Sequence, residues 1–120
     1  MSECIHYYRL TLLSNGVSMY ATAASLLYII RWYIKERARG AVISLNAKSV
    51  KRMVREFADH YGCRGELPPY ASRHIMRVLR AILNAANTSP INGDLHVARV
   101  DDILNAPVDR IIAELMRGEA

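Results

Sequence analysis

Apolar residues recur along this chain at the spacing of helices. Between residues 46 and 61 they fall at i, i+3, i+4, i+7, i+8 and i+11, which places them on one side of an α-helix. Ser18 and Asn46 precede two such stretches, and their side-chain oxygens can accept hydrogen bonds from the unpaired amides of a helix N-terminus. The pattern therefore predicts helices over residues 5–13, 18–38, 46–61, 70–86 and from Pro107 onward.

Two short segments read as strands. Residues 41–45 form a β-like apolar run, and residues 95–100 alternate weakly between apolar and polar side chains. Residues 87–94, between the helix expected at 70–86 and the run at 95–100, are rich in Asn, Ser, Pro and Gly, which is typical of turns. A short helical turn is expected at Asp101.

One uncharged stretch has the length of a membrane span. Residues 10–30 carry no charge and are flanked by Arg9 and Arg31. However, Ser14-Asn15-Gly16 is a turn signal inside the stretch, so we expect two helices broken there. A membrane association is the less favoured interpretation, and the N-terminus does not resemble a signal peptide.

The length and the predicted elements indicate a small, mainly α protein. A chain of 120 residues accommodates a single domain with a terminal extension. We expect an N-terminal helical extension at 1–16, a winged-helix-like core of three helices with minor β at 17–100, and a C-terminal amphipathic helix at 101–120 that is a candidate dimerisation element.

Positive charge is concentrated in the middle of the chain. Residues 31–80 contain twelve Lys or Arg against four Asp or Glu, a net charge of +8. The first thirty residues are neutral and the last forty carry −3. A basic centre between neutral and acidic flanks favours contact with a polyanion, and nucleic acid is the commonest one.

The order of elements resembles the winged helix-turn-helix superfamily over roughly residues 18–100. The family places the start of its recognition helix in the DNA major groove. Here the resemblance implies that residues 46–61 are the supporting helix, 70–86 the recognition helix and 88–99 the wing. It implies major-groove contacts from Tyr70, Ser72, Arg73, His74 and Arg77. The implied phosphate contacts come from Lys48, Lys51, Arg52, Arg55 and Arg80.

The sequence-based hypothesis is therefore a double-stranded DNA-binding transcriptional regulator. A homodimer would bind two half-sites about one helical turn apart, and the expected location is the cytoplasm. Thirteen of the sixteen basic residues are Arg and Gln is absent, a composition that we read as archaeal or viral and thermophilic.

Two other functions remain open at this stage. The first is a helical structural subunit, a coat or nucleoid protein, that assembles on nucleic acid and in the coat case is located in the virion. The second is a helical adaptor in a larger nucleoprotein complex, with its basic side on RNA or on an acidic protein. The apolar helix at 19–34 and the C-terminal stripe would supply the subunit contacts in the first case.

Candidate catalytic and metal chemistry is sparse. No nucleophile elbow, phosphate loop, metalloprotease helix or catalytic triad is present in the sequence, so no enzymatic activity, cofactor or small-molecule substrate is expected. The two cysteines, Cys4 and Cys63, are expected to be reduced intracellular thiols. A zinc site from Cys4, His6, His60 and Cys63 is a less favoured alternative, and no metal is expected.

The seven tyrosines invite a second binding hypothesis, in which bases of a single strand stack on aromatic rings. Tyr70 is the expected exposed candidate. The periodicity instead places four others in the core, on or beside apolar stripes: Tyr20, Tyr28, Tyr33 and Tyr61.

Overall fold

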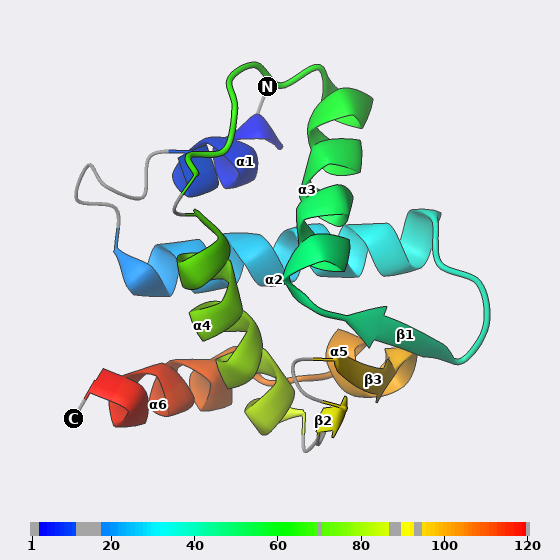
Figure 1. Cartoon of the computed structure of the whole chain (residues 1–120), viewed down its shortest axis with the longest axis vertical. Coiled ribbons are helices and arrows are strands. Elements are labelled where there is room, and N and C mark those ends of the chain that lie inside the picture. The colour runs from blue at the N-terminus through cyan, green and yellow to red at the C-terminus, as the bar shows by residue number, and fades with distance from the viewer. Residues whose placement is uncertain (1–2, 12–17, 70, 87–89, 93–94, 120) are drawn as a thin grey trace.

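The structure is a computed structural model, and it describes residues 3–11, 18–69, 71–86, 90–92 and 95–119. Within these ranges six helices pack with a small antiparallel sheet that lies at one edge of the molecule, which confirms a mainly α fold with minor β (Figure 1). The elements are α1 (Cys4–Thr11), α2 (Met19–Glu36), β1 (Val42–Leu45), α3 (Ala47–Tyr61), α4 (Ala71–Ala85), β2 (Pro90–Asn92), β3 (Leu95–Arg99), α5 (Val100–Leu104) and α6 (Val108–Glu119).

Helix α2 runs through the centre of the molecule, and the other helices pack around it (Figure 1). Its sequence is apolar on nearly every side, and Leu26, Ile29 and Ile30 are fully buried. A helix of this kind is stable only where neighbours cover it from several directions. Ser18 caps it as predicted, because its Oγ accepts a hydrogen bond from Tyr20 N at 3.1 Å.

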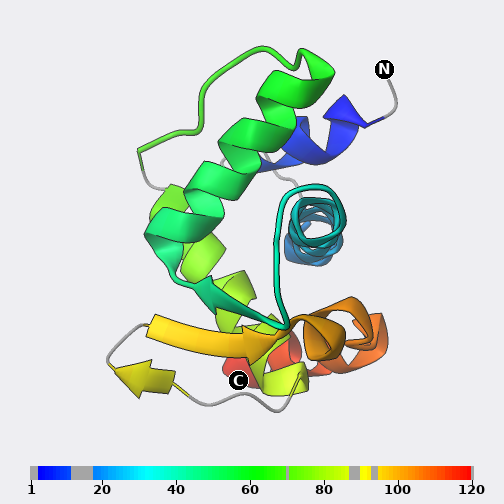
Figure 2. The same cartoon turned by 90° about the vertical axis from the view of Figure 1, so that its right-hand side faces the viewer.

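Helices α3 and α4 lie on one side of α2, as Figure 2 shows. Asn46 and Ser49 form a capping box at the start of α3: Ser49 N donates to Asn46 Oδ1 at 2.7 Å and Asn46 N donates to Ser49 Oγ at 3.0 Å. Gly62 ends the helix at φ +69°, a left-handed conformation that glycine adopts without steric cost. The predicted apolar stripe of α3 is buried from Val50 to Ala58.

The sheet joins segments far apart in the sequence, with the strand order β1-β3-β2. Strand β3 lies between the other two and pairs antiparallel with both, with Ile43 opposite Ala98. Ile43 and Leu45 of β1 point into the core while Val42 and Ser44 are exposed, the alternation expected of a sheet with one covered face. Of the predicted wing, residues 88–89 and 93–94 lie outside the described ranges.

Helix α6 packs against α4 and α2 through Ile111 and Leu115, which are buried. Ile112 is half-buried, and two residues of the stripe remain exposed within the described chain, Val108 at 42% and Met116 at 56%. Half of the candidate dimerisation stripe is thus used within the molecule. Its role between molecules stays a prediction.

Arg31 ties α2 to the segment between α5 and α6. Its Nε donates to Ile103 O at 3.3 Å, and its NH2 donates to Ala106 O at 2.6 Å. Ala106 O lies beyond the end of α5, and Ile103 O near that end also accepts a hydrogen bond from Ala106 N at 3.4 Å. Arg31, which directly follows the uncharged segment 10–30, therefore holds α5 and the residues after it against α2.

Replacing Arg31 with methionine is expected to lower the free energy of unfolding by about 2 kcal/mol, because two charge-assisted hydrogen bonds to half-buried carbonyls are lost. Urea denaturation followed by circular dichroism measures the change. The matched control is Lys35→Met on the exposed side of the same helix, for which we expect a change within about 0.5 kcal/mol. Equal effects of the two variants would contradict a role for the Arg31 contacts.

No helix within the described ranges combines the length and the apolar character needed to cross a membrane. The uncharged segment that raised this question forms parts of two helices, α1 ending at Thr11 and α2 beginning at Met19, as the turn signal between them predicted. Residues 12–17, which contain the Ser14-Asn15-Gly16 sequence, lie outside the described ranges.

Candidate nucleic-acid interface

The outward side of α3 is basic. Lys48, Arg52 and Arg55 are exposed, and Lys51 is half-buried at the border of the helix. These residues alternate with the buried stripe because the helical repeat places apolar and charged positions on opposite sides. All four sequence-predicted phosphate-binding residues of this helix are therefore accessible to a ligand.

The outward side of α4 carries a line of arginines. Arg73, Arg77 and Arg80 are exposed at the spacing i, i+4, i+7, while Ile75, Leu79 and Ile82 on the other side are fully or almost fully buried. Arginine presents a planar fork of donors that fits phosphate oxygens or the O6 and N7 atoms of guanine. The line thus has the chemistry that either kind of contact requires.

The other predicted residues at the start of α4 are less accessible. Ser72 and His74 are half-buried, which leaves each only part of its surface for a ligand. Tyr70 lies outside the described residues, so its predicted contact is not addressed by the structure. The centre of the candidate interface consequently shifts from the first turn of α4 toward its arginine line.

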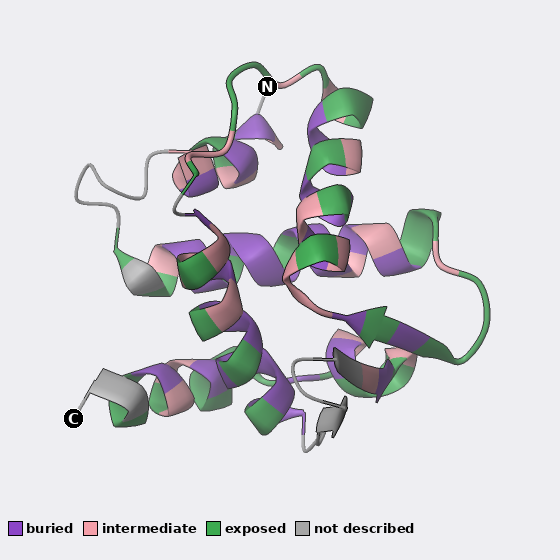
Figure 3. Ribbon diagram, in the orientation of Figure 1, coloured by how far each residue is buried: buried purple, intermediate pink, exposed green. Residues whose placement is uncertain are grey.

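Helices α3 and α4, which carry these basic residues, lie on the same side of α2 (Figure 2). Both helices are in front of α2 in Figure 1, and exposed stretches of both face the reader in Figure 3. The β2–β3 hairpin projects on this side too, below α3 and α4 in Figure 2. We call the seven cations on the two helices the basic face: Lys48, Lys51, Arg52, Arg55, Arg73, Arg77 and Arg80.

A groove of about 270 Å³ lies at the surface where α4 and α6 meet, at the edge of the basic face. Arg77, Arg80 and Asn84 line it from α4, and Glu114 lines it from α6. Glu114 also forms an ion pair with Arg117 at 3.2 Å. A carboxylate at this edge repels phosphate, so it limits how far a polyanion can extend toward α6.

Sequence reasoning missed two members of this edge. Asn84 is exposed and continues the line of Arg73, Arg77 and Arg80 by four residues, a spacing that the sequence already contained. Its amide can bind adenine N6 and N7. Glu114 could not be found in this way, because only the packing of α6 on α4 brings it there.

The expectation of two reduced cysteines is wrong. Cys4 and Cys63 form a disulfide with their Cα atoms 5.5 Å apart, linking α1 to the residues after α3. The alternative zinc site fails for the same reason, since two of its four ligands are consumed in that bond. His6 instead lies 3.0 Å from Ser25 Oγ, and burial, followed by the positive charge of Arg9, lowers its pKa. No cluster of metal-ligating side chains occurs in the described part of the chain.

The core assignment of the tyrosines is wrong for two of them. Tyr20 and Tyr28 are 39% and 42% exposed on the outer side of α2, and the ring of Tyr28 stacks on His6 with 4.0 Å between centroids. Tyr33 and Tyr61 are partly buried against the core, as predicted. The exposed pair belongs to α2 and not to α3 or α4, which carry the basic residues, so it is not interleaved with those cations as a stacking platform would be.

Comparison of the chain with protein-family models, with curated proteins and with solved structures gives no significant match to any of them.

Proposed function

We propose that this chain is a double-stranded DNA-binding protein of winged-helix type that acts as a transcriptional regulator. The observation that carries the proposal is the basic face, which consists of seven exposed or half-buried cations on two helices that lie on the same side of α2 (Figure 2). A face of this density neutralises several phosphates at once and supplies most of the affinity for DNA. It is opposed by only two acidic residues on the outward sides of α3 and α4, Glu56 and Asp59.

The arrangement of elements supports the winged-helix assignment. Helix α2, strand β1, helices α3 and α4 and the β2–β3 hairpin follow in the order that the resemblance implies. In this proposal α4 enters the major groove, where Arg73, Arg77 and Asn84 meet base edges. The four cations of α3 and Arg80 contact phosphates.

The proposal includes a homodimer and an intracellular location. Exposed apolar residues on α2 and α6, among them Tyr28 and Met116, support self-association. Intracellular proteins of hyperthermophiles carry disulfides, so the Cys4–Cys63 bond is compatible with a thermophilic source and a cytoplasmic regulator.

Fluorescence anisotropy with a labelled random-sequence duplex, repeated across a salt series, tests the proposal. If the basic face contacts phosphates as proposed, the slope of log Kd against log salt is expected to be about 4.5, because each of the five proposed phosphate contacts contributes about 0.9. Selection from a randomised duplex library is then expected to enrich a sequence with two similar half-sites. An absence of binding at low salt would contradict the proposal.

A structural subunit that assembles on nucleic acid is the second candidate. It is favoured by the separation of exposed apolar residues on two different helices, Tyr20 and Tyr28 on α2 and Val108 and Met116 on α6. Two different patches permit head-to-tail contacts that do not close into a dimer. Sedimentation velocity distinguishes the candidates: a discrete dimer at every concentration favours the regulator, and growing assemblies without sequence preference favour the structural subunit.

A further inference from the structure

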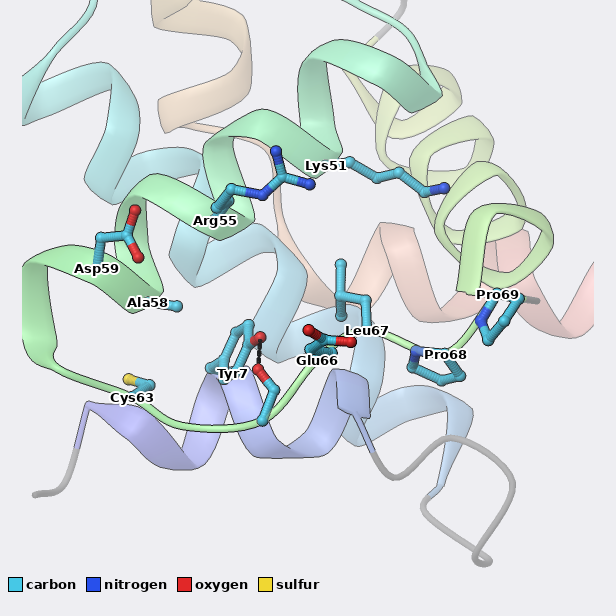
Figure 4. Close-up of a pocket in the computed structure, with 11 residues that line it drawn as sticks. Tyr7, Lys51, Arg55, Ala58, Asp59, Cys63, Glu66, Leu67, Pro68 and Pro69 are labelled. Carbon is cyan, nitrogen blue, oxygen red and sulfur yellow. Dashed lines mark hydrogen bonds between the residues drawn. The ribbon is translucent and has the colours of Figure 1, made fainter.

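A second hollow, larger than the groove beside α6, lies between α3, the connector that follows it and α1. It measures about 560 Å³, within the range of small-molecule sites in proteins. Figure 4 shows Lys51 and Arg55 along the α3 side and Glu66 on the connector side. Tyr7, Leu67 and Pro68 complete much of its lining. We call this hollow the connector pocket.

The charges of the connector pocket are balanced but not paired. Lys51 and Arg55 supply two positive charges, and Asp59 and Glu66 supply two negative ones. Within the described part of the chain, no ion pair within 4 Å joins any of these four side chains to an oppositely charged group. Four charged groups therefore surround one cavity with their hydrogen-bonding capacity available to a ligand.

The walls of the pocket are held in place by contacts outside it. The Cys4–Cys63 disulfide and a 2.6 Å hydrogen bond from Tyr7 Oη to Gly65 O attach the connector to α1. Burial raises the pKa of Tyr7, and the carboxylates of Glu66 and Asp59 raise it further, so the hydroxyl stays protonated and continues to donate. At the other end, Ala71 N donates to Pro68 O at 2.9 Å. A site held in this way loses little entropy on binding.

We propose that the connector pocket binds a small zwitterion of the α-amino-acid type. Lys51 and Arg55, one helical turn apart on α3, hold the carboxylate of the ligand. Glu66 on the opposite wall holds its ammonium group, and Leu67 and Pro68 contact its apolar part. A ligand with one charged group alone would satisfy one wall and be repelled by the other.

An NMR titration of the full chain, with its disulfide intact, tests this inference. The probes are the twenty protein amino acids, first in pools and then singly, against a ¹⁵N-labelled sample. Saturable shifts of the amides of Gly65 and Glu66 are expected for at least one amino acid, with a Kd below about 1 mM. Acetate and ethylammonium carry one charged group each, and both are expected to bind at least about tenfold more weakly.

Three variants make the test specific. Arg55→Ala and Glu66→Gln are each expected to weaken binding of the amino acid about tenfold, since each removes one charged partner. Lys48→Ala is the matched control, because Lys48 is an exposed cation of the same helix that does not line the pocket. The proposal is overturned if no amino acid gives saturable shifts, if Arg55→Ala and Lys48→Ala behave alike, or if acetate binds as well as the amino acid and Glu66→Gln strengthens binding.

Lys51 and Arg55 belong to both the connector pocket and the basic face. Binding of an amino acid is therefore expected to affect DNA binding, an expectation that rests on the proposed function. When Lys51 and Arg55 bind the carboxylate of an amino acid, these two of the seven cations of the basic face are no longer available to phosphates. The affinity for DNA is then expected to fall about tenfold. Titrating the amino acid into a preformed DNA complex measures this. If the amino acid shifts the NMR signals but leaves DNA affinity unchanged, the proposal that it binds in the connector pocket stands, and the proposal that both ligands use Lys51 and Arg55 is overturned. Absent DNA binding would overturn the proposed function alone.

Discussion

Replacing Arg73, Arg77 and Arg80 together with alanine is expected to lower the affinity for duplex DNA by at least about a hundredfold at moderate salt. The three side chains form the exposed line of α4, and each contributes either a phosphate contact or a fork to guanine. Fluorescence anisotropy against the selected duplex measures the loss. The salt dependence of the variant is expected to be shallower by about one, because Arg80 is the one proposed phosphate contact among the three.

A matched control separates position from net charge. Lys35, Arg37 and Arg39 are exposed at or just beyond the C-terminal end of α2, so their triple alanine variant loses the same three charges away from the basic face. We expect it to bind DNA within about threefold of the parent chain, with only weaker long-range attraction lost. If the two triple variants lose affinity equally, the basic face has been assigned to the wrong side of the molecule.

Single substitutions divide the roles within the basic face. Arg77→Ala is expected to reduce the preference for the selected sequence, because it removes a contact to base edges. Lys51→Ala is expected to weaken all duplexes alike and to flatten the salt slope by about one, as a phosphate contact does. Unchanged binding by both variants would show that the basic face has been assigned wrongly.

Breaking the Cys4–Cys63 disulfide is expected to lower the free energy of unfolding by about 4 kcal/mol. The bond closes a loop of 59 residues, and in the chain-entropy account the stabilisation grows with the logarithm of loop length. A domain of this size has a total stability of roughly 5–15 kcal/mol, so the loss is a large fraction of it. Urea denaturation of Cys4→Ser/Cys63→Ser against the oxidised parent measures the change.

Reduction of the parent protein supplies the control for this prediction. Tris(2-carboxyethyl)phosphine is expected to move the parent midpoint toward that of the double variant and to leave the double variant unchanged. A parent midpoint that does not respond to the reductant, while a thiol assay shows the bond cleaved, would contradict the prediction. The Tyr7–Gly65 hydrogen bond also holds α1 on the connector, so we expect the reduced protein to keep its helices at room temperature.

Local signals determined most of the secondary structure. Ser18, Asn46 and Gly62 begin or end helices through contacts with residues only a few positions away, so their effects are present in any short stretch of sequence. The basic side of each helix is equally local, because the helical repeat alone sets Arg73, Arg77 and Arg80 opposite the buried stripe of α4. These features could be predicted without knowing how the helices pack.

The tertiary structure decided what depends on distant partners. Cys4 and Cys63 are 59 residues apart, and only the packing of α1 against the end of α3 makes them a disulfide rather than two thiols. The same packing buries Tyr7 while Tyr28, on an otherwise apolar helix, remains exposed. The connector pocket and the approach of Glu114 to the arginine line also arise between elements, where burial and charge depend on which surfaces meet. Periodicity tells which side of a helix is apolar, but a side chain's partners follow from the arrangement of whole helices in space.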